Sequence, residues 1–244
     1  MSANEEATLP GRPKEMLKTW AVRAALIALG LAAWFETQAM LGARKPRSSQ
    51  ADLRISAQVL SRGDAMHEWL APLHRRLEEN RHWAHGLLIV SSATIDLLAA
   101  FLLGWSIFGK SLRPFVGLLV LFSLRQICQV LSALPPPPGM IWEDPGFPTV
   151  LVYYEVTNDL FFSGHTAIAV LGAIELGRYG GAKLRLLAVV IAVFLTATVL
   201  VLYAHYTMDV FAGAMTALFA ASLSKWLAPY CDRGVARLVA VEAP

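Results

Sequence analysis

Six apolar runs divide the chain, and each is long enough, or nearly so, to cross about 30 Å of hydrocarbon. The runs cover residues 20–41, 86–108, 114–134, 161–176, 184–203 and 208–227. Backbone polar groups in lipid must be hydrogen-bonded within the segment that carries them, so each run is predicted to be a helix. The fourth run is the shortest, and apolar residues at 150–154 precede it. We therefore predict an all-α fold: a six-transmembrane-helix polytopic membrane protein.

The segment 42–85 between the first two runs has a different pattern, because its apolar residues alternate with mixed charges. Ile55, Val59, Leu70, Leu73 and Leu77 recur at roughly helical intervals. This predicts an interfacial amphipathic helix that lies on the membrane surface. The segment also contains His67, His74, His82 and His85. The last two have helical spacing for a metal site, but no carboxylate or cysteine completes it, and we expect four interfacial histidines and no metal.

Composition supports the membrane interpretation. The chain has 244 residues, of which 56% are hydrophobic and 16% charged, with a mean hydropathy of +0.50. Soluble domains carry about 25% charged residues. We predict one six-helix membrane domain over 20–227, between a cytoplasmic tail at 1–19 and another at 228–244. The net charge of +3 is small, and the basic residues cluster between apolar runs, so no nucleic-acid partner is expected.

The placement of basic residues predicts the orientation. With a cytoplasmic N-terminus, both tails and the basic turns near 110 and 180 face the cytoplasm, where Lys and Arg are favoured. The loops 135–160 and 204–207 then lie outside and contain no Lys or Arg. The segment 42–85 also lies outside with eight basic residues, but long loops follow the rule poorly. We predict that both termini are cytoplasmic.

The first candidate for chemistry is the start of the fourth predicted helix, at residues 158–166. Ser163 is a good N-cap, and Gly164 lets a ligand approach the backbone. The free N–H groups and the dipole of the first helical turn attract an anion. His165 would therefore lie next to a phosphate bound by that turn.

The second candidate is the segment 205–209, between the fifth and sixth predicted helices. His205 and Asp209 are four residues apart and share one face of a helix. A carboxylate there can hold one imidazole nitrogen and leave the other as a nucleophile or base. The fourth helix begins and the fifth ends on the same side, which brings His165 and His205 to one face of the membrane. A single histidine or aspartate at a helix end is usually interfacial or a cap, and only the combination favours catalysis.

Three further features leave alternatives open. Arg125 lies within an apolar run, where a charge faces the protein interior or a water-filled cavity. It either binds phosphate or pairs with Asp96 or Glu36. The prolines of 134–139 end the third helix and form either a rigid loop or the mouth of a site. Glu175 and Arg178 are expected to pair, and Trp142, Tyr153 and Tyr154 to form an interfacial aromatic belt.

At these motifs the sequence resembles the sphingomyelin synthase family of the type 2 phosphatidic acid phosphatase superfamily, over roughly residues 125–225. Residues 162–166, Phe-Ser-Gly-His-Thr, look like the third motif of that family. Residues 205–210, His-Tyr-Thr-Met-Asp-Val, look like the fourth, and 125–137 is similar to a more variable segment. The sequence departs from the family at 157–158, where Cys-Gly is usual, and at Ala204, where animal members carry an acidic residue.

The resemblance implies a mechanism in which His205, oriented by Asp209, attacks the phosphorus of a phospholipid head group. His165 would protonate the departing diacylglycerol oxygen, and a phosphohistidine would pass its group to a lipid hydroxyl such as that of ceramide. The expected substrate-binding residues are Arg125, Asp159, Ser163, Gly164, Thr166 and Tyr206. The site would face the outer, lumenal or periplasmic side, with no metal or cofactor.

Two other functions remain open from the sequence. The same site would make a lipid phosphatase or phospholipase C-like hydrolase if water were the acceptor. A non-catalytic lipid-binding protein could also keep the motifs by descent, although the intact triad argues against it. The expected partners are membrane lipids: a phospholipid donor and a ceramide- or diacylglycerol-like acceptor. Assembly into a homo-oligomer stays open.

Overall fold

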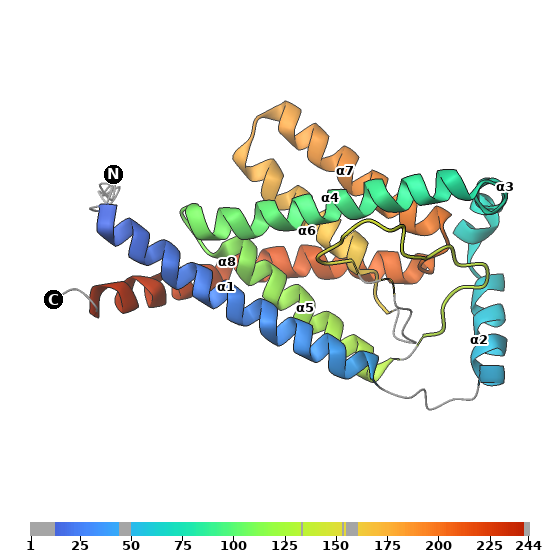
Figure 1. The fold of residues 1–244 in the computed structure, drawn as a ribbon, viewed down its shortest axis with the longest axis horizontal. Coiled ribbons are helices and arrows are strands. Elements are labelled where there is room, and N and C mark those ends of the chain that lie inside the picture. Colours follow the sequence, from blue (N-terminus) through green and yellow to red (C-terminus); the bar gives the residue numbers. More distant parts are fainter. Residues whose placement is uncertain (1–12, 44–49, 133, 153, 155–160, 242–244) are drawn as a thin grey trace.

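A computed structural model describes residues 13–43, 50–132, 134–152, 154 and 161–241, and their regular structure is entirely helical (Figure 1). The described helices are α1 (Pro13–Gly42), α2 (Gln50–Arg62), α3 (Ala65–Glu79), α4 (Arg81–Phe108), α5 (Arg113–Leu131), α6 (Gly164–Tyr179), α7 (Ala182–Val201) and α8 (Thr207–Val241). The all-α prediction is thus confirmed for the described part of the chain.

Five of the described helices are long and apolar enough to cross a membrane: α1, α4, α5, α7 and α8. They correspond to five of the six predicted spans. The remaining predicted span, the fourth along the chain at 161–176, corresponds to α6, which has 16 residues and is about 24 Å long at 1.5 Å per residue. It also contains Glu175, a fully buried carboxylate. Five of the six predicted spans are therefore supported. That α6 crosses the membrane stays a prediction.

The segment 42–85 forms α2, α3 and the first turn of α4 rather than one amphipathic helix. Asp64 separates the first two, because its side chain accepts hydrogen bonds from the N–H groups of Met66 and His67 and caps α3. The expectation of interfacial histidines is wrong for His67 and His74, which are only 2% and 4% exposed. They lie on the buried face of α3, which packs against the end of α7.

The long helices run side by side along the long axis of the molecule (Figure 1). The apolar core lies between α5, α6 and α8, around Leu121, Leu171 and Ala217. Helix α3 and the start of α8 lie at one end, and the described ends of the chain lie at the other. Residues 228–241, expected to be a tail, continue α8 as helix through Pro229.

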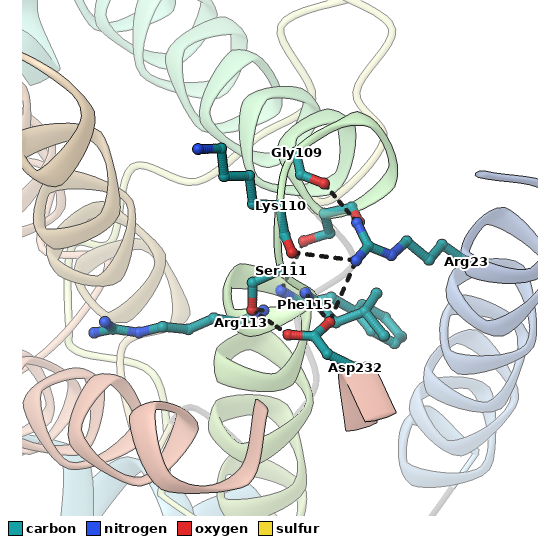
Figure 2. Close-up of polar contacts among 9 residues, drawn as sticks. Arg23, Gly109, Lys110, Ser111, Arg113, Phe115 and Asp232 are labelled. Atoms are coloured by element: carbon teal, nitrogen blue, oxygen red, sulfur yellow. Dashed lines mark hydrogen bonds and ion pairs between the residues drawn. The ribbon is translucent and has the colours of Figure 1, made fainter. Parts of the chain in front are cut away.

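A buried polar cluster joins three elements at the end where the described termini lie (Figure 2). The guanidinium of Arg23 in α1 donates to the carbonyl oxygen of Gly109 at 2.6 Å and pairs with Asp232 of α8 at 3.4 Å. Asp232 also accepts from the Ser111 hydroxyl at 2.6 Å and the Leu112 N–H at 2.9 Å. A buried charge is tolerated where its partners satisfy it. The cluster therefore holds α1 and α8 against the α4–α5 turn.

Candidate active site

The turn that connects α7 to α8 positions His205. Tyr203 adopts a φ of 54°, a left-handed conformation that is uncommon for a residue other than glycine. The Ala204 N–H then bonds back to the Val199 carbonyl at 2.9 Å, which ends α7. His205 follows directly and is 6% exposed. The chain reversal therefore places this imidazole inside the protein, immediately before the first turn of α8.

Asp209 faces His205 from the first turn of α8. Its Oδ2 atom lies 3.6 Å from His205 Nδ1 and accepts a hydrogen bond from the Tyr206 N–H at 3.1 Å. The 3.6 Å separation is an ion-pair contact and too long for a hydrogen bond. Catalytic hydrogen bonds are often long before substrate binds and shorten in the reacting complex. Because Nδ1 faces the carboxylate, Nε2 is the nitrogen left for chemistry.

The start of α6 carries His165 and is attached to α8. Ser163 caps α6, since its side chain accepts the Thr166 N–H at 3.3 Å, and its own N–H donates to the Asp209 carbonyl at 3.1 Å. A β-carbon on Gly213 of α8 would lie 2.6 Å from the Ser163 carbonyl oxygen, so only glycine permits this approach. His165 is 9% exposed and lies within electrostatic range of His205. The structure thus brings the two histidines together from segments 40 residues apart.

Arg125 of α5 lies against the N-terminus of α6. Its Nε donates to the Phe162 carbonyl at 3.2 Å, and a β-carbon on Gly164 would lie 3.2 Å from the same nitrogen. Asp96, one of its expected partners, instead accepts the N–H groups of Val150 and Leu151 at 2.9 and 3.0 Å. The guanidinium adds positive charge where helix N–H groups already attract anions, and phosphate binding by Arg125 stays a prediction.

Several buried polar atoms of the two motifs have no hydrogen-bond partner among the described residues. They are His165 Nε2, Thr166 Oγ1, His205 Nδ1, the Tyr206 hydroxyl and Asp209 Oδ1. Buried polar atoms normally have a partner. His205 Nδ1 and Asp209 face each other, but His165 Nε2 and the Thr166 and Tyr206 hydroxyls have no partner among the described residues and can receive a polar ligand. Burial and the charges of Asp209 and Asp64 raise the pKa of Tyr206 to about 12, which keeps its hydroxyl protonated as a donor.

Helix α3 and its cap directly contact the turn that carries His205, a contact that the sequence did not predict. The carboxylate of Asp64 accepts the Thr207 N–H at 2.7 Å and the Thr207 hydroxyl at 2.5 Å. The His67 ring donates through Nε2 to the carbonyl oxygen of His205 at 3.0 Å. His74 donates through Nδ1 to the Val201 carbonyl at 2.8 Å. No local signal reveals these contacts, because the partners are more than 120 residues apart.

The loop that follows the prolines also reaches the site. The Ile141 N–H donates to the Leu202 carbonyl at 2.9 Å, which joins this loop to the catalytic turn. The Trp142 ring, expected in an interfacial belt, lies edge-on to His165 with centroids 5.1 Å apart and packs against the cluster of Val199, Leu200, Ala204 and Val210. The contact supports the alternative in which the proline loop shapes the mouth of the site.

Two further expectations concern Asp159 and metal binding. Asp159, an expected substrate-binding residue, lies outside the described residues. Within the described ranges, no group of three or more His, Cys, Asp or Glu side chains is arranged to hold a metal ion.

The fold and the site define an integral membrane protein with a buried His/His/Asp cluster. The model of the AtPDCT1/2 family matches residues 64–226, which is more than half of the chain and includes α3 and both histidine motifs. The chain belongs to this family, a phosphatidylcholine:diacylglycerol cholinephosphotransferase family, and is a membrane lipid phosphotransferase. No curated protein and no solved structure matches the chain.

The expected membership in the sphingomyelin synthase family is therefore wrong. AtPDCT1/2 is a related but distinct family. The error has a chemical cause: the resemblance rested on the two histidine motifs, which carry phosphoryl-transfer chemistry and do not specify the acceptor. The departures at 157–158 and Ala204 lie beside those motifs.

Proposed function

We propose that the protein transfers phosphocholine from phosphatidylcholine to the hydroxyl of diacylglycerol. The observation that carries this proposal is the family match across residues 64–226, which spans both histidine motifs. The buried polar atoms of those motifs that have no hydrogen-bond partner among the described residues support it, because His165 Nε2 and the Thr166 and Tyr206 hydroxyls can donate to a phosphate. Ceramide, the acceptor implied by the sphingomyelin synthase resemblance, loses its support with that resemblance.

In the first step, His205 Nε2 attacks the phosphorus of phosphatidylcholine. The bond between phosphorus and the glycerol oxygen breaks, and His165 donates a proton to that oxygen, so that diacylglycerol leaves. Phosphocholine remains covalently attached to His205. Asp209, 3.6 Å from Nδ1, orients the imidazole and stabilises the positive charge that the ring gains.

In the second step, a different diacylglycerol enters and His165 takes the proton from its hydroxyl. The resulting oxygen attacks phosphorus, the bond from phosphorus to His205 breaks, and a new phosphatidylcholine forms. Charge on the phosphoryl oxygens develops near Arg125, the α6 N-terminus and the Tyr206 hydroxyl. Such fixed donors stabilise the transition state of phosphoryl transfer.

The experiment uses purified full-length protein in mixed micelles with phosphatidylcholine labelled in the choline group. Diacylglycerol with acyl chains of a different mass serves as the acceptor. We expect labelled phosphatidylcholine that carries the acceptor's acyl chains, and no such product from His205→Ala. Because donor and product belong to one lipid class, acyl mass is the measurement that separates exchange from unreacted donor.

Parallel reactions separate the other acceptors. Labelled product that forms with ceramide and not with diacylglycerol would contradict the proposed acceptor while leaving the site intact. Release of water-soluble phosphocholine without any lipid product would indicate hydrolysis. Transfer that persists in His205→Ala would overturn the assignment of the nucleophile.

A further inference from the structure

An open groove lies between α6 and α7, away from the histidine site. Its volume is about 690 Å³, and its walls are mostly apolar. Val170 and Ile174 line it from α6, and Val189 and Val193 line it from α7. On each helix these residues are four positions apart and therefore share one face. Four residues closer to the α6–α7 turn, the same face of each helix carries an arginine: Arg178 on α6 and Arg185 on α7.

The dimensions of the groove suit one acyl chain. From residue 170 to residue 178, α6 advances eight residues, or about 12 Å. One leaflet contributes about 15 Å of the hydrocarbon thickness. A chain that lies along the groove would therefore extend from the membrane interior to the arginines, and a lipid phosphate would reach their level.

Positive charge exceeds negative charge at the arginine end. The buried carboxylate of Glu175 lies 3.2 Å from Arg113 Nε and 3.5 Å from Arg178. Figure 2 shows the Arg113 side chain extending away from the Arg23–Asp232 cluster. Arg185 donates through Nε to the Gly177 carbonyl at 3.1 Å, and no carboxylate among the described residues forms an ion pair with it. Arg113 and Arg178 thus share one carboxylate, and Arg185 adds a third positive charge beside them.

We propose that this groove binds an anionic glycerophospholipid, with one acyl chain against the valines and the phosphate against Arg178 and Arg185. The arginines of the groove lie near the C-terminal end of α6, whereas His165 lies in its first turn, so the bound phosphate is separate from the reacting lipids. Basic pockets between membrane helices recognise anionic head groups. Guanidinium binds phosphate oxygens in a bidentate geometry. This geometry distinguishes binding of one specific lipid from the non-specific contacts of the helices with bulk lipid.

Native mass spectrometry of the full-length protein in detergent tests the proposal, with phosphatidylglycerol and phosphatidylcholine titrated separately. We expect phosphatidylglycerol to bind more tightly than phosphatidylcholine. Arg185→Gln should weaken phosphatidylglycerol binding about tenfold, the effect of losing one charge-assisted contact, while Arg185→Lys should lose less. The matched control is Arg237→Gln, an exposed arginine near the end of α8, which should change nothing.

A second variant tests the apolar part of the same groove. Ala192→Phe fills the space beside Val193 without altering charge, and it should weaken phosphatidylglycerol binding while elution as a single folded species persists. Equal affinity for the two lipids, or equal losses in Arg185→Gln and Arg237→Gln, would overturn the proposal. Displacement of bound phosphatidylglycerol by inorganic phosphate alone would also overturn the proposal, because the apolar groove would then contribute nothing to lipid affinity. These outcomes do not depend on transfer activity.

Discussion

The histidines carry the proposed chemistry, but their neighbours determine what each can do. His205 presents Nε2 for reaction because Asp209 faces Nδ1. Asp209 also accepts the Tyr206 N–H with the same oxygen, and its backbone carbonyl accepts the Ser163 N–H. One aspartate therefore orients the imidazole, stabilises the first turn of α8 and attaches that turn to α6.

Asp209→Asn should lower the transfer rate by about 10²- to 10⁴-fold, because the amide cannot stabilise a positively charged imidazole. The side-chain oxygen can still accept the Tyr206 N–H, so the melting temperature should change little. The measurement is the rate of acyl-mass exchange beside a thermal melt. A large fall in melting temperature would show that the aspartate acts mainly in folding.

Tyr206→Phe removes one hydroxyl from a residue that is 6% exposed. The pKa of Tyr206 is raised to about 12 by burial and by Asp209 and Asp64, so the hydroxyl stays neutral at pH 6–9. We expect a rate about tenfold lower at every pH in this range, as for loss of one hydrogen bond to a charged group. A variant whose pH profile differs in shape from that of the unaltered protein would contradict a constant donor role.

At the scale of elements, α3 contacts the candidate site although it lies outside the predicted membrane helices. It contacts the catalytic turn through Asp64, His67 and His74, and the Tyr203 ring stacks on His74 with centroids 3.7 Å apart. Tyr203 also donates its hydroxyl to the His67 carbonyl at 2.5 Å. The turn that carries His205 is thus held by α3 on one side and by α7 and α8 on the other.

Asp64→Asn should destabilise this contact and lower transfer. Burial raises the pKa of Asp64, but hydrogen bonds from Thr207 and the charge of His67 outweigh burial and leave the pKa below 3.8. A lowered pKa stabilises the fold above pH 3.8 and loses that contribution as pH falls through the folded value. Thermal melts between pH 3 and pH 7 should therefore show a smaller acid-induced loss in Asp64→Asn.

Glu68→Gln is the matched control for Asp64→Asn, since Glu68 is an exposed acid in the first turn of the same helix. We expect its melts and transfer rate to follow those of the unaltered protein. Identical acid-induced losses in Asp64→Asn and the unaltered protein would show that the Thr207 contact contributes no pH-dependent stability.

Gly213→Ala tests the contact between α6 and α8. The added β-carbon would lie 2.6 Å from the Ser163 carbonyl oxygen, so the N-terminus of α6 must move away. We expect lower melting temperature and slower transfer. Gly234→Ala in the same helix meets nothing within 4 Å, and there alanine should stabilise by about 0.5–1 kcal/mol. Equal behaviour of the two variants would show that the contact is not needed.

At the scale of the whole molecule, the two ends differ in chemistry. One end carries the histidine site, α3 and the loop with Trp142. The other carries the Arg23–Asp232 cluster and the continuation of α8. The predicted orientation places the first end outside and the second in the cytoplasm.

Cysteine labelling measures that orientation. Cys231 is exposed near the end of α8, and Pro148 is exposed in the loop that reaches the site. In sealed right-side-out vesicles, a membrane-impermeant maleimide should label Pro148→Cys and should leave Cys231 unlabelled until the vesicles are opened. Cys128→Ser removes the other thiol from the assay. The reverse labelling pattern would invert the proposed topology.

The sequence by itself determined the helices and the two motifs, because both depend on neighbours along the chain. Apolar length locates α1, α4, α5, α7 and α8, the Ser163 cap locates the start of α6, and a four-residue spacing pairs His205 with Asp209. The same local character explains the wrong family assignment, since the motifs describe a reaction and not its substrates. For Glu175, the sequence predicted only the local pair with Arg178. It did not predict the burial of the carboxylate or its contact with Arg113.

Only the tertiary structure decided which distant residues complete the site. Asp64 reaches Thr207 across 143 positions, and His67 reaches His205 across 138. Trp142 meets His165, and Gly213 meets Ser163, through helix packing that no local pattern encodes. An isolated polar residue at an interface looks the same in sequence whether it faces water or caps a neighbouring turn. Burial and close packing between elements distinguish the two, and both arise only when the helices assemble.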